Sequence, residues 1–118
     1  MNNIEDLIIY KHYLEMIFYT EKILEKYPKI EKNGLCITIK NYTYDGMENI
    51  IKAQKTRDIK IRINYLNTLD VDMKMLKVLI RLSKRRKYIN VRNYGAWSRK
   101  ITNICNLLGG WINSCVKR

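Results

Sequence analysis

The sequence contains few residues that break helices or build compact sites. Among its 118 residues there are one proline, five glycines and one histidine, and no two of its three cysteines form a C-x-x-C pair. The scarcity of proline and glycine favours long helices over a fold with many turns. One histidine and an odd number of cysteines argue against a structural zinc site or a disulfide framework. We therefore expect reduced cysteines that act as apolar fillers, and no metal.

Acidic residues are scarce in the second half of the chain. Residues 57–118 contain 15 lysines and arginines but only three acidic residues, whereas residues 1–56 contain eight of each. The whole formal net charge of +12 therefore lies in the second half. A field this one-sided attracts polyanions. We favour nucleic acid as the partner over the alternative of a basic face kept only for solubility.

Patterns typical of export and of catalysis are also missing. The N-terminus carries acids where a signal peptide needs bases, and no stretch reaches the ~18 apolar residues of a membrane-spanning helix. We expect a cytoplasmic protein with no membrane partner. No metalloprotease, serine-hydrolase or phosphate-loop motif occurs. No arginine precedes His12, which excludes the Arg–His motif of small four-helix ribonucleases. We expect no catalytic residues, no enzymatic activity and no cofactor.

Apolar residues recur every three or four positions over four segments, a spacing that predicts helices. The first three segments cover about residues 3–27, 32–54 and 58–88, and the fourth begins after the N-cap candidate Asn90. The predicted core stripes of the last two are Ile59, Ile63, Leu66, Leu69, Met73, Leu76 and Ile80, and Tyr94, Trp97, Ile101, Ile104, Leu108, Trp111 and Cys115. Helices of this length joined by short loops form an antiparallel up-down-up-down four-helix bundle. We therefore predict an all-α fold with a single domain over residues 1–118.

The first predicted helix carries two adjacent apolar stripes, which together make a face too wide for one groove. The stripes are Leu7, Tyr10, Leu14, Ile17 and Leu24, and Ile9, Tyr13, Met16, Ile23 and Tyr27. We expect this helix to pack inside its own bundle and against another subunit. Asn2 or Asn3 is a candidate cap for it, and Pro28 is expected to stop it. Gly46, inside the second helix, is expected to permit a close approach between helices.

The third predicted helix carries a row of cations spaced three or four residues apart, where like charges repel. A sequence that keeps such a row usually has an anionic partner. For the cluster KRRK at residues 84–87, the alternative is that it only complements the dipole of the helix end. Lysines and arginines of this kind bind phosphates and read little sequence. We predict that nucleic acid or another partner binds Lys74, Lys77, Arg81, Lys84, Arg85 and Arg86, with Arg92 and Arg99 of the fourth helix.

Several segments match a known family. They are residues 7–11 (LIIYK), 25–29 (EKYPK), 57–58 (RD), 81–83 (RLS), 87–89 (KYI) and 108–112 (LGGWI). In these segments the chain resembles the Avd-like four-helix-bundle proteins, the accessory variability determinants of diversity-generating retroelements. That family is related to the 23S rRNA-intervening-sequence proteins. LGGWI is the most specific of the segments, and we expect its glycines to allow close approach of another helix while Trp111 continues the core stripe.

The resemblance implies a non-catalytic protein that forms a homopentamer. Such proteins bind nucleic acid and the reverse transcriptase of the element, and they support error-prone copying of a template RNA into cDNA. The alternative is a stand-alone nucleic-acid-binding or assembly protein, like the rRNA-intervening-sequence group. RNA and DNA both stay open as ligands, and the positive surface could instead contact an acidic patch of the polymerase.

Overall fold

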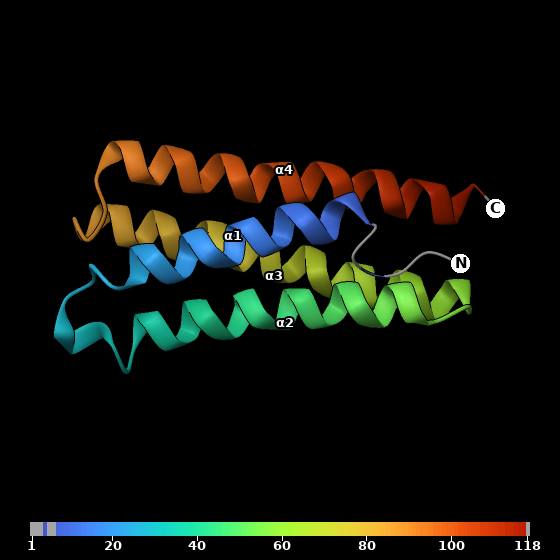
Figure 1. Ribbon diagram of the computed structural model, residues 1–118, viewed down its shortest axis with the longest axis horizontal. Coiled ribbons are helices and arrows are strands. Elements are labelled where there is room, and N and C mark those ends of the chain that lie inside the picture. The colour runs from blue at the N-terminus through green and yellow to red at the C-terminus, as the bar shows by residue number, and fades with distance from the viewer. Residues whose placement is uncertain (1–3, 5–6, 118) are drawn as a thin grey trace.

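The protein is an elongated bundle of four α-helices that measures 46 × 24 × 21 Å. It is described by a computed structural model that covers residue 4 and residues 7–117. The helices are α1 (Ile8–Leu24), α2 (Leu35–Lys55), α3 (Ile59–Arg85) and α4 (Val91–Val116), with a short 3₁₀ helix, η2 (Lys29–Glu31), before α2. They run alternately up and down, so α1 begins and α4 ends at the same end of the bundle (Figure 1). The predicted all-α four-helix bundle is confirmed.

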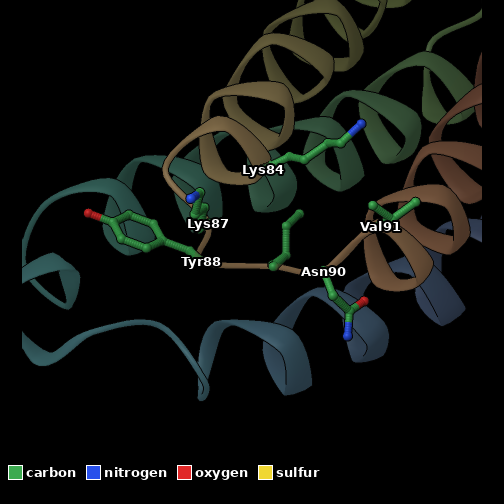
Figure 2. A pocket seen from close by; sticks show the side chains of 6 residues that line it. Lys84, Lys87, Tyr88, Asn90 and Val91 are labelled. Carbon is green, nitrogen blue, oxygen red and sulfur yellow. The ribbon is translucent and has the colours of Figure 1, made fainter.

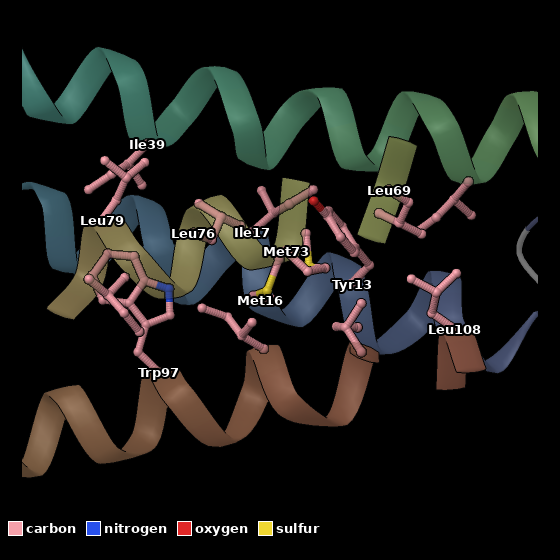
Figure 3. Packing of buried hydrophobic residues seen from close by; sticks show 14 of the residues in the cluster. Tyr13, Met16, Ile17, Ile39, Leu69, Met73, Leu76, Leu79, Trp97 and Leu108 are labelled. Atoms are coloured by element: carbon pink, nitrogen blue, oxygen red, sulfur yellow. The ribbon is translucent and has the colours of Figure 1, made fainter. Parts of the chain in front are cut away.

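The four helices form a ring around one core. Each helix packs against its neighbours in the chain, and α4 packs back against α1 to close the ring. Trp97 and Leu79 lie toward one end of the core and Leu69 and Leu108 toward the other (Figure 3). On the core stripes predicted for α3 and α4, the residues from Leu66 to Ile80 and from Trp97 to Leu108 are buried.

The two apolar stripes of α1 differ in burial. The whole second stripe, from Ile9 to Tyr27, is buried in the bundle. In the first stripe Ile17 and Leu24 are buried, whereas Leu7, Tyr10 and Leu14 are only half-buried. Packing of α1 inside its own bundle is thus confirmed, and contact with another subunit stays a prediction.

The predicted starts of α3 and α4 are correct, because both helices begin at side-chain caps. Asp58 Oδ1 accepts hydrogen bonds from the backbone N–H of Lys60 at 2.9 Å and of Ile61 at 3.2 Å. Asn90 Oδ1 accepts one from the N–H of Asn93 at 2.7 Å.

The predicted bounds of the first helix are wrong at both ends. The cap candidates Asn2 and Asn3 lie outside the described residues. Leu7 has an extended backbone, so α1 begins only at Ile8. It ends at Leu24, four residues before Pro28.

Helix α3 ends three residues earlier than predicted, at a turn that lacks the glycine usually found at the end of a helix. Lys87 has a left-handed backbone, with φ of 66°. Its N–H donates to the carbonyl of Lys84 at 2.9 Å, and the N–H of Tyr88 donates to the carbonyl of Ser83 at 3.0 Å. These two bonds form a Schellman motif, whose left-handed position is usually glycine. A lysine there costs about 1 kcal/mol.

Gly46 lies where α2 meets α1. A methyl group at this position would collide with the hydroxyl of Tyr13. That hydroxyl is buried and donates a hydrogen bond to the carbonyl of Thr43 at 2.6 Å, so the ring is held in place. The predicted close approach at Gly46 is confirmed.

A pair of carboxyl groups joins α2 to α3. Asp72 is only 4% exposed and faces Asp45. The side-chain amide of Asn49 donates to Oδ2 of Asp45 at 3.0 Å and to Oδ2 of Asp72 at 3.2 Å. Burial, together with the neighbouring Asp45 carboxyl, raises the pKa of Asp72 from 3.8 to about 7. The pair therefore stores a pH-dependent part of the folding free energy.

The cysteines are all free, with Cys36 and Cys115 buried and Cys105 half-buried. Groups of three or more His, Cys, Asp and Glu side chains able to hold a metal ion are absent from the described residues. None of the helices, over the part of each that the structure describes, combines the length and the apolar character needed to cross a membrane.

Candidate nucleic-acid interface

A groove of about 210 Å³ runs along the outer side of the contact between α3 and α4. Lys77 and Arg81 line it from α3, and Tyr94, Ser98 and Thr102 line it from α4. The two cations belong to the row predicted from the sequence. They stand side by side because a spacing of four residues returns to the same face of a helix.

Tyr94 interacts with cations and a hydroxyl of this groove. Hydrogen bonding from the Arg81 side chain lowers the pKa of Tyr94, and Ser98 and the charge of Lys84 act in the same direction. The ammonium group of Lys84 lies 4.6 Å from the centroid of the Tyr94 ring, within range of a cation–π contact. The spacing of apolar residues predicted that Tyr94 lies in the core of the bundle. In the structure Tyr94 is half-buried, and its phenol lies close to Arg81 and Lys84.

Two of the eight predicted contact residues are neutralised by ion pairs. Lys74 Nζ lies 2.7 Å from Oδ1 of Asp70 one turn away, and Arg86 Nη1 lies 3.4 Å from Oε2 of Glu31. Within the described part of the chain, no ion pair forms at the other six, which are Lys77, Arg81, Lys84, Arg85, Arg92 and Arg99. These six cations are therefore available to an anionic partner.

The predicted residues fall into two groups on either side of α4. Lys77, Arg81 and Lys84 surround the groove. Arg92 and Arg99 instead lie near Tyr19 of α1. Burial raises the pKa of the Tyr19 phenol, and the positive charges of the two arginines oppose that rise. On the same side, the Lys100 ammonium lies 5.3 Å from the centroid of the Tyr19 ring. The structure thus places a second, more dispersed group of cations along the contact between α1 and α4.

A second hollow, of about 440 Å³, lies at the turn between α3 and α4. Its lining residues are Lys84, Lys87, Tyr88, Ile89, Asn90 and Val91. Figure 2 shows that Tyr88 points away from Val91; Lys84 comes from the last turn of α3 and Lys87 from the turn that follows it. Lys84 contributes to this hollow and also covers Tyr94, so it links the turn to the groove.

The glycines of the LGGWI segment do not lie against another helix of the chain. Helix α4 continues through them to Val116, as expected. However, a Cβ atom added at Gly109 or Gly110 would meet no atom within 4 Å. Trp111 is half-buried and lines a small cavity with Ile59 and Arg62. No helix of this chain makes the expected close approach, and an approach by a helix of another copy stays a prediction.

Three residues of the groove were not predicted as site residues from the sequence: Tyr94, Ser98 and Thr102. The predicted contacts also left out Lys87, although this residue lines the hollow at the turn. The spacing of Tyr94, Ser98 and Thr102, one turn apart on α4, was visible in the sequence. The sequence did not show that this face of α4 meets the cations of α3, because that contact depends on how the two helices are rotated in the bundle.

Comparisons with known proteins agree with this architecture. A family model described as bAvd-like matches residues 7–115. Among solved structures, the chain is similar to a protein with unknown function from the S23 ribosomal protein family of Bacteroides thetaiotaomicron. The TM-score is 0.83 at 20% sequence identity, over 90% of this chain and 96% of that chain. At this identity the likeness shows a shared fold. No curated protein matches the sequence.

Proposed function

Because this chain belongs to the bAvd-like family, we propose that it is a non-catalytic accessory subunit of a diversity-generating retroelement. In this role it binds the reverse transcriptase of the element and its template nucleic acid, and it supports mutagenic cDNA synthesis. The observation that carries the proposal is the surface of α3 and α4, where six of the eight predicted cations have no ion-pair partner among the described residues.

The chemistry of this surface suits a nucleic-acid backbone. Lysines and arginines bind phosphates through charge and release condensed counterions, which makes binding strong at low salt and independent of sequence. In the described part of α3 and α4, Asp70 and Asp72 are the only acids. Asp70 is paired with Lys74 and Asp72 is buried, so neither opposes an anion at the groove.

We also propose that the protein forms a homo-oligomer, by family resemblance a pentamer, through an apolar face of α1 and α2. Ile37, Tyr44 and Ile51 are spaced seven residues apart on one face of α2 and are 42%, 43% and 43% exposed. The hydroxyl of Tyr44 donates to Oε2 of Glu21 on α1 at 2.6 Å, which places this face beside α1. One turn before Glu21 lies Phe18, which is 61% exposed.

The position of this face is compatible with nucleic-acid binding. In the ring of helices, the contact between α1 and α2 lies across the bundle from the contact between α3 and α4. Assembly through the first contact leaves the groove open to solvent. Several copies in one assembly would then multiply weak phosphate contacts through effective concentration.

The second candidate function is a stand-alone nucleic-acid-binding or assembly protein. The structural likeness to a member of the S23 ribosomal protein family favours this candidate. It predicts phosphate binding by the same surface but no association with a reverse transcriptase. A reverse-transcriptase gene and a pair of near-identical repeats next to this gene would favour the accessory role.

Co-expression with a neighbouring reverse transcriptase tests the accessory role. We expect the two proteins to co-purify, and deletion of this gene to abolish or reduce cDNA synthesis. Failure to co-purify together with unchanged cDNA synthesis would reject the accessory role.

Charge reversal tests the nucleic-acid surface. The double variant Lys77→Glu and Arg81→Glu is expected to bind RNA and DNA much more weakly and with a shallower salt dependence. The matched control is Lys55→Glu and Lys60→Glu, which reverses two exposed charges where α2 ends and α3 begins. Equal losses in both double variants would mean that only net charge matters.

A further inference from the structure

The groove between α3 and α4 presents two parallel rows of hydrogen-bond donors. Lys77 and Arg81, one turn apart on α3, form the cation row, and Ser98 and Thr102, one turn apart on α4, form the hydroxyl row. The residues that line the groove include no carboxylate. An anion in the groove would therefore meet charged donors on one wall and neutral donors on the other.

The hydroxyls of this row do not donate to carbonyls of their own helix within the described residues. Hydroxyls inside helices usually donate to a carbonyl of their own helix, and in this protein Thr38, Thr43, Thr68, Ser83 and Ser114 do so. Within the described residues, the Thr102 hydroxyl makes no hydrogen bond at all. The Ser98 side chain instead interacts with Tyr94, whose pKa it helps to lower.

Tyr94 lies in the groove with both rows. The side chains of Arg81 and Ser98, one from each row, interact with its phenol and lower its pKa. Lys84 covers the ring of Tyr94 at 4.6 Å, which leaves less of that ring free for stacking on a base. This arrangement favours an anion over a nucleobase as the ligand.

The available length of the groove is short. At one end, the ion pair between Lys74 and Asp70 places a carboxylate beside the row and closes it to anions. From Lys77 to Lys84 the helix rises about 10 Å, which accommodates only a few nucleotides. The site therefore suits individual phosphates of a passing strand.

We propose that this groove is a phosphate-binding subsite, in which a nucleic-acid phosphodiester binds the cation row through one non-bridging oxygen and the hydroxyl row through the other. The inference rests on the proposed nucleic-acid binding and adds to it a set of neutral contacts on α4. The two rows contribute in different ways. Binding to cations releases counterions and is weakened by salt, whereas hydrogen bonds from hydroxyls leave the salt dependence unchanged.

Fluorescence polarisation with a labelled single strand of about 20 uridines, measured at several salt concentrations, separates the two rows. The hydroxyl-row variant is Ser98→Ala with Thr102→Ala, and the cation-row variant is Lys77→Ala with Arg81→Ala. The control, Thr38→Ala with Thr68→Ala, removes two hydroxyls outside the groove. Alanine has the highest helix propensity, so we expect all three variants to stay folded.

We expect the hydroxyl-row variant to bind about tenfold more weakly at an unchanged salt slope, which corresponds to two solvent-exposed hydrogen bonds at the weak end of the usual range. The cation-row variant should reduce the slope by about 1.4, corresponding to two phosphate contacts on a single strand. The control should bind like the wild type. A hydroxyl-row variant that also binds like the wild type, beside a weakened cation-row variant, overturns the subsite and leaves the proposed function standing. Absence of RNA binding by the wild type rejects the proposed nucleic-acid binding, and the subsite falls with it.

Discussion

Replacing Asp72 with asparagine is expected to stabilise the protein at alkaline pH and to change its stability little at acidic pH. Burial and the neighbouring Asp45 raise the pKa of Asp72 from 3.8 to about 7. A carboxyl group whose folded pKa lies above its unfolded value contributes its stability while it is protonated, fully so below the unfolded pKa. That contribution is lost as the pH rises through the folded pKa, because a buried negative charge then faces Asp45.

The size of the effect follows from the two pKa values. The interval between 3.8 and about 7 corresponds to at most about 4 kcal/mol of folding free energy. The new amide can accept from Asn49 and donate to Asp45, so the packing is retained. At about pH 8.5 we expect the Asp72→Asn variant to be about 2 to 4 kcal/mol more stable than the wild type. Near pH 4 the difference should fall below about 1 kcal/mol.

Urea unfolding followed by circular dichroism measures this difference across pH. Both proteins are compared at one concentration, because assembly changes the apparent stability. The control is Asp70→Asn, which removes an exposed carboxylate paired with Lys74 on the same helix. Its effect should stay below about 1 kcal/mol at neutral and alkaline pH. Burial raises the pKa of Tyr13, which also faces the pair, so this phenol stays neutral over the range. An Asp72→Asn variant that is less stable than the wild type at alkaline pH would refute the reasoning.

Three further outcomes are expected from the packing. Gly46→Ala should destabilise the fold by about 1 to 3 kcal/mol in urea unfolding, because the new methyl group collides with Tyr13 and outweighs the helix propensity gained; an unchanged midpoint would contradict the close approach. Trp111→Ala should cost about 1 to 3 kcal/mol, less than the 3–5 typical of a fully buried tryptophan, since this side chain is half-buried; its melting temperature checks this. Light scattering should show a wild-type mass several times 14.2 kDa, reduced toward 14.2 kDa by Phe18→Glu with Tyr44→Glu; a wild type that is already monomeric would reject assembly through this face.

Local signals in the sequence predicted the helices well. The N-cap candidate Asn90 marked the start of α4, because a capping side chain acts within three residues of its own position. The spacing of core residues such as Trp97 and Ile101 predicted which face of α4 is buried, since one helix alone determines that periodicity. The predicted end of α3 failed at Lys87 because its left-handed backbone is normally signalled by a glycine.

Features that need two helices could not be predicted from periodicity. The contact of Asp45 with Asp72 joins residues on different helices, and it depends on how α2 and α3 are rotated and shifted relative to each other. The same holds for the hydroxyl row, which lies opposite the cation row only because of the rotation of α4. The sequence therefore predicted the cations of the candidate site but not the hydroxyl row opposite them.

The residue at position 87, in the turn after α3, is under two opposing selective pressures. Glycine at position 87 would relieve the left-handed backbone by about 1 kcal/mol, yet the chain has a lysine there, and this lysine lines the hollow beside Lys84. Folding and charge thus place opposite demands on one residue. Selection for thermostability alone should replace this lysine with glycine early, at the expense of one positive charge beside the groove.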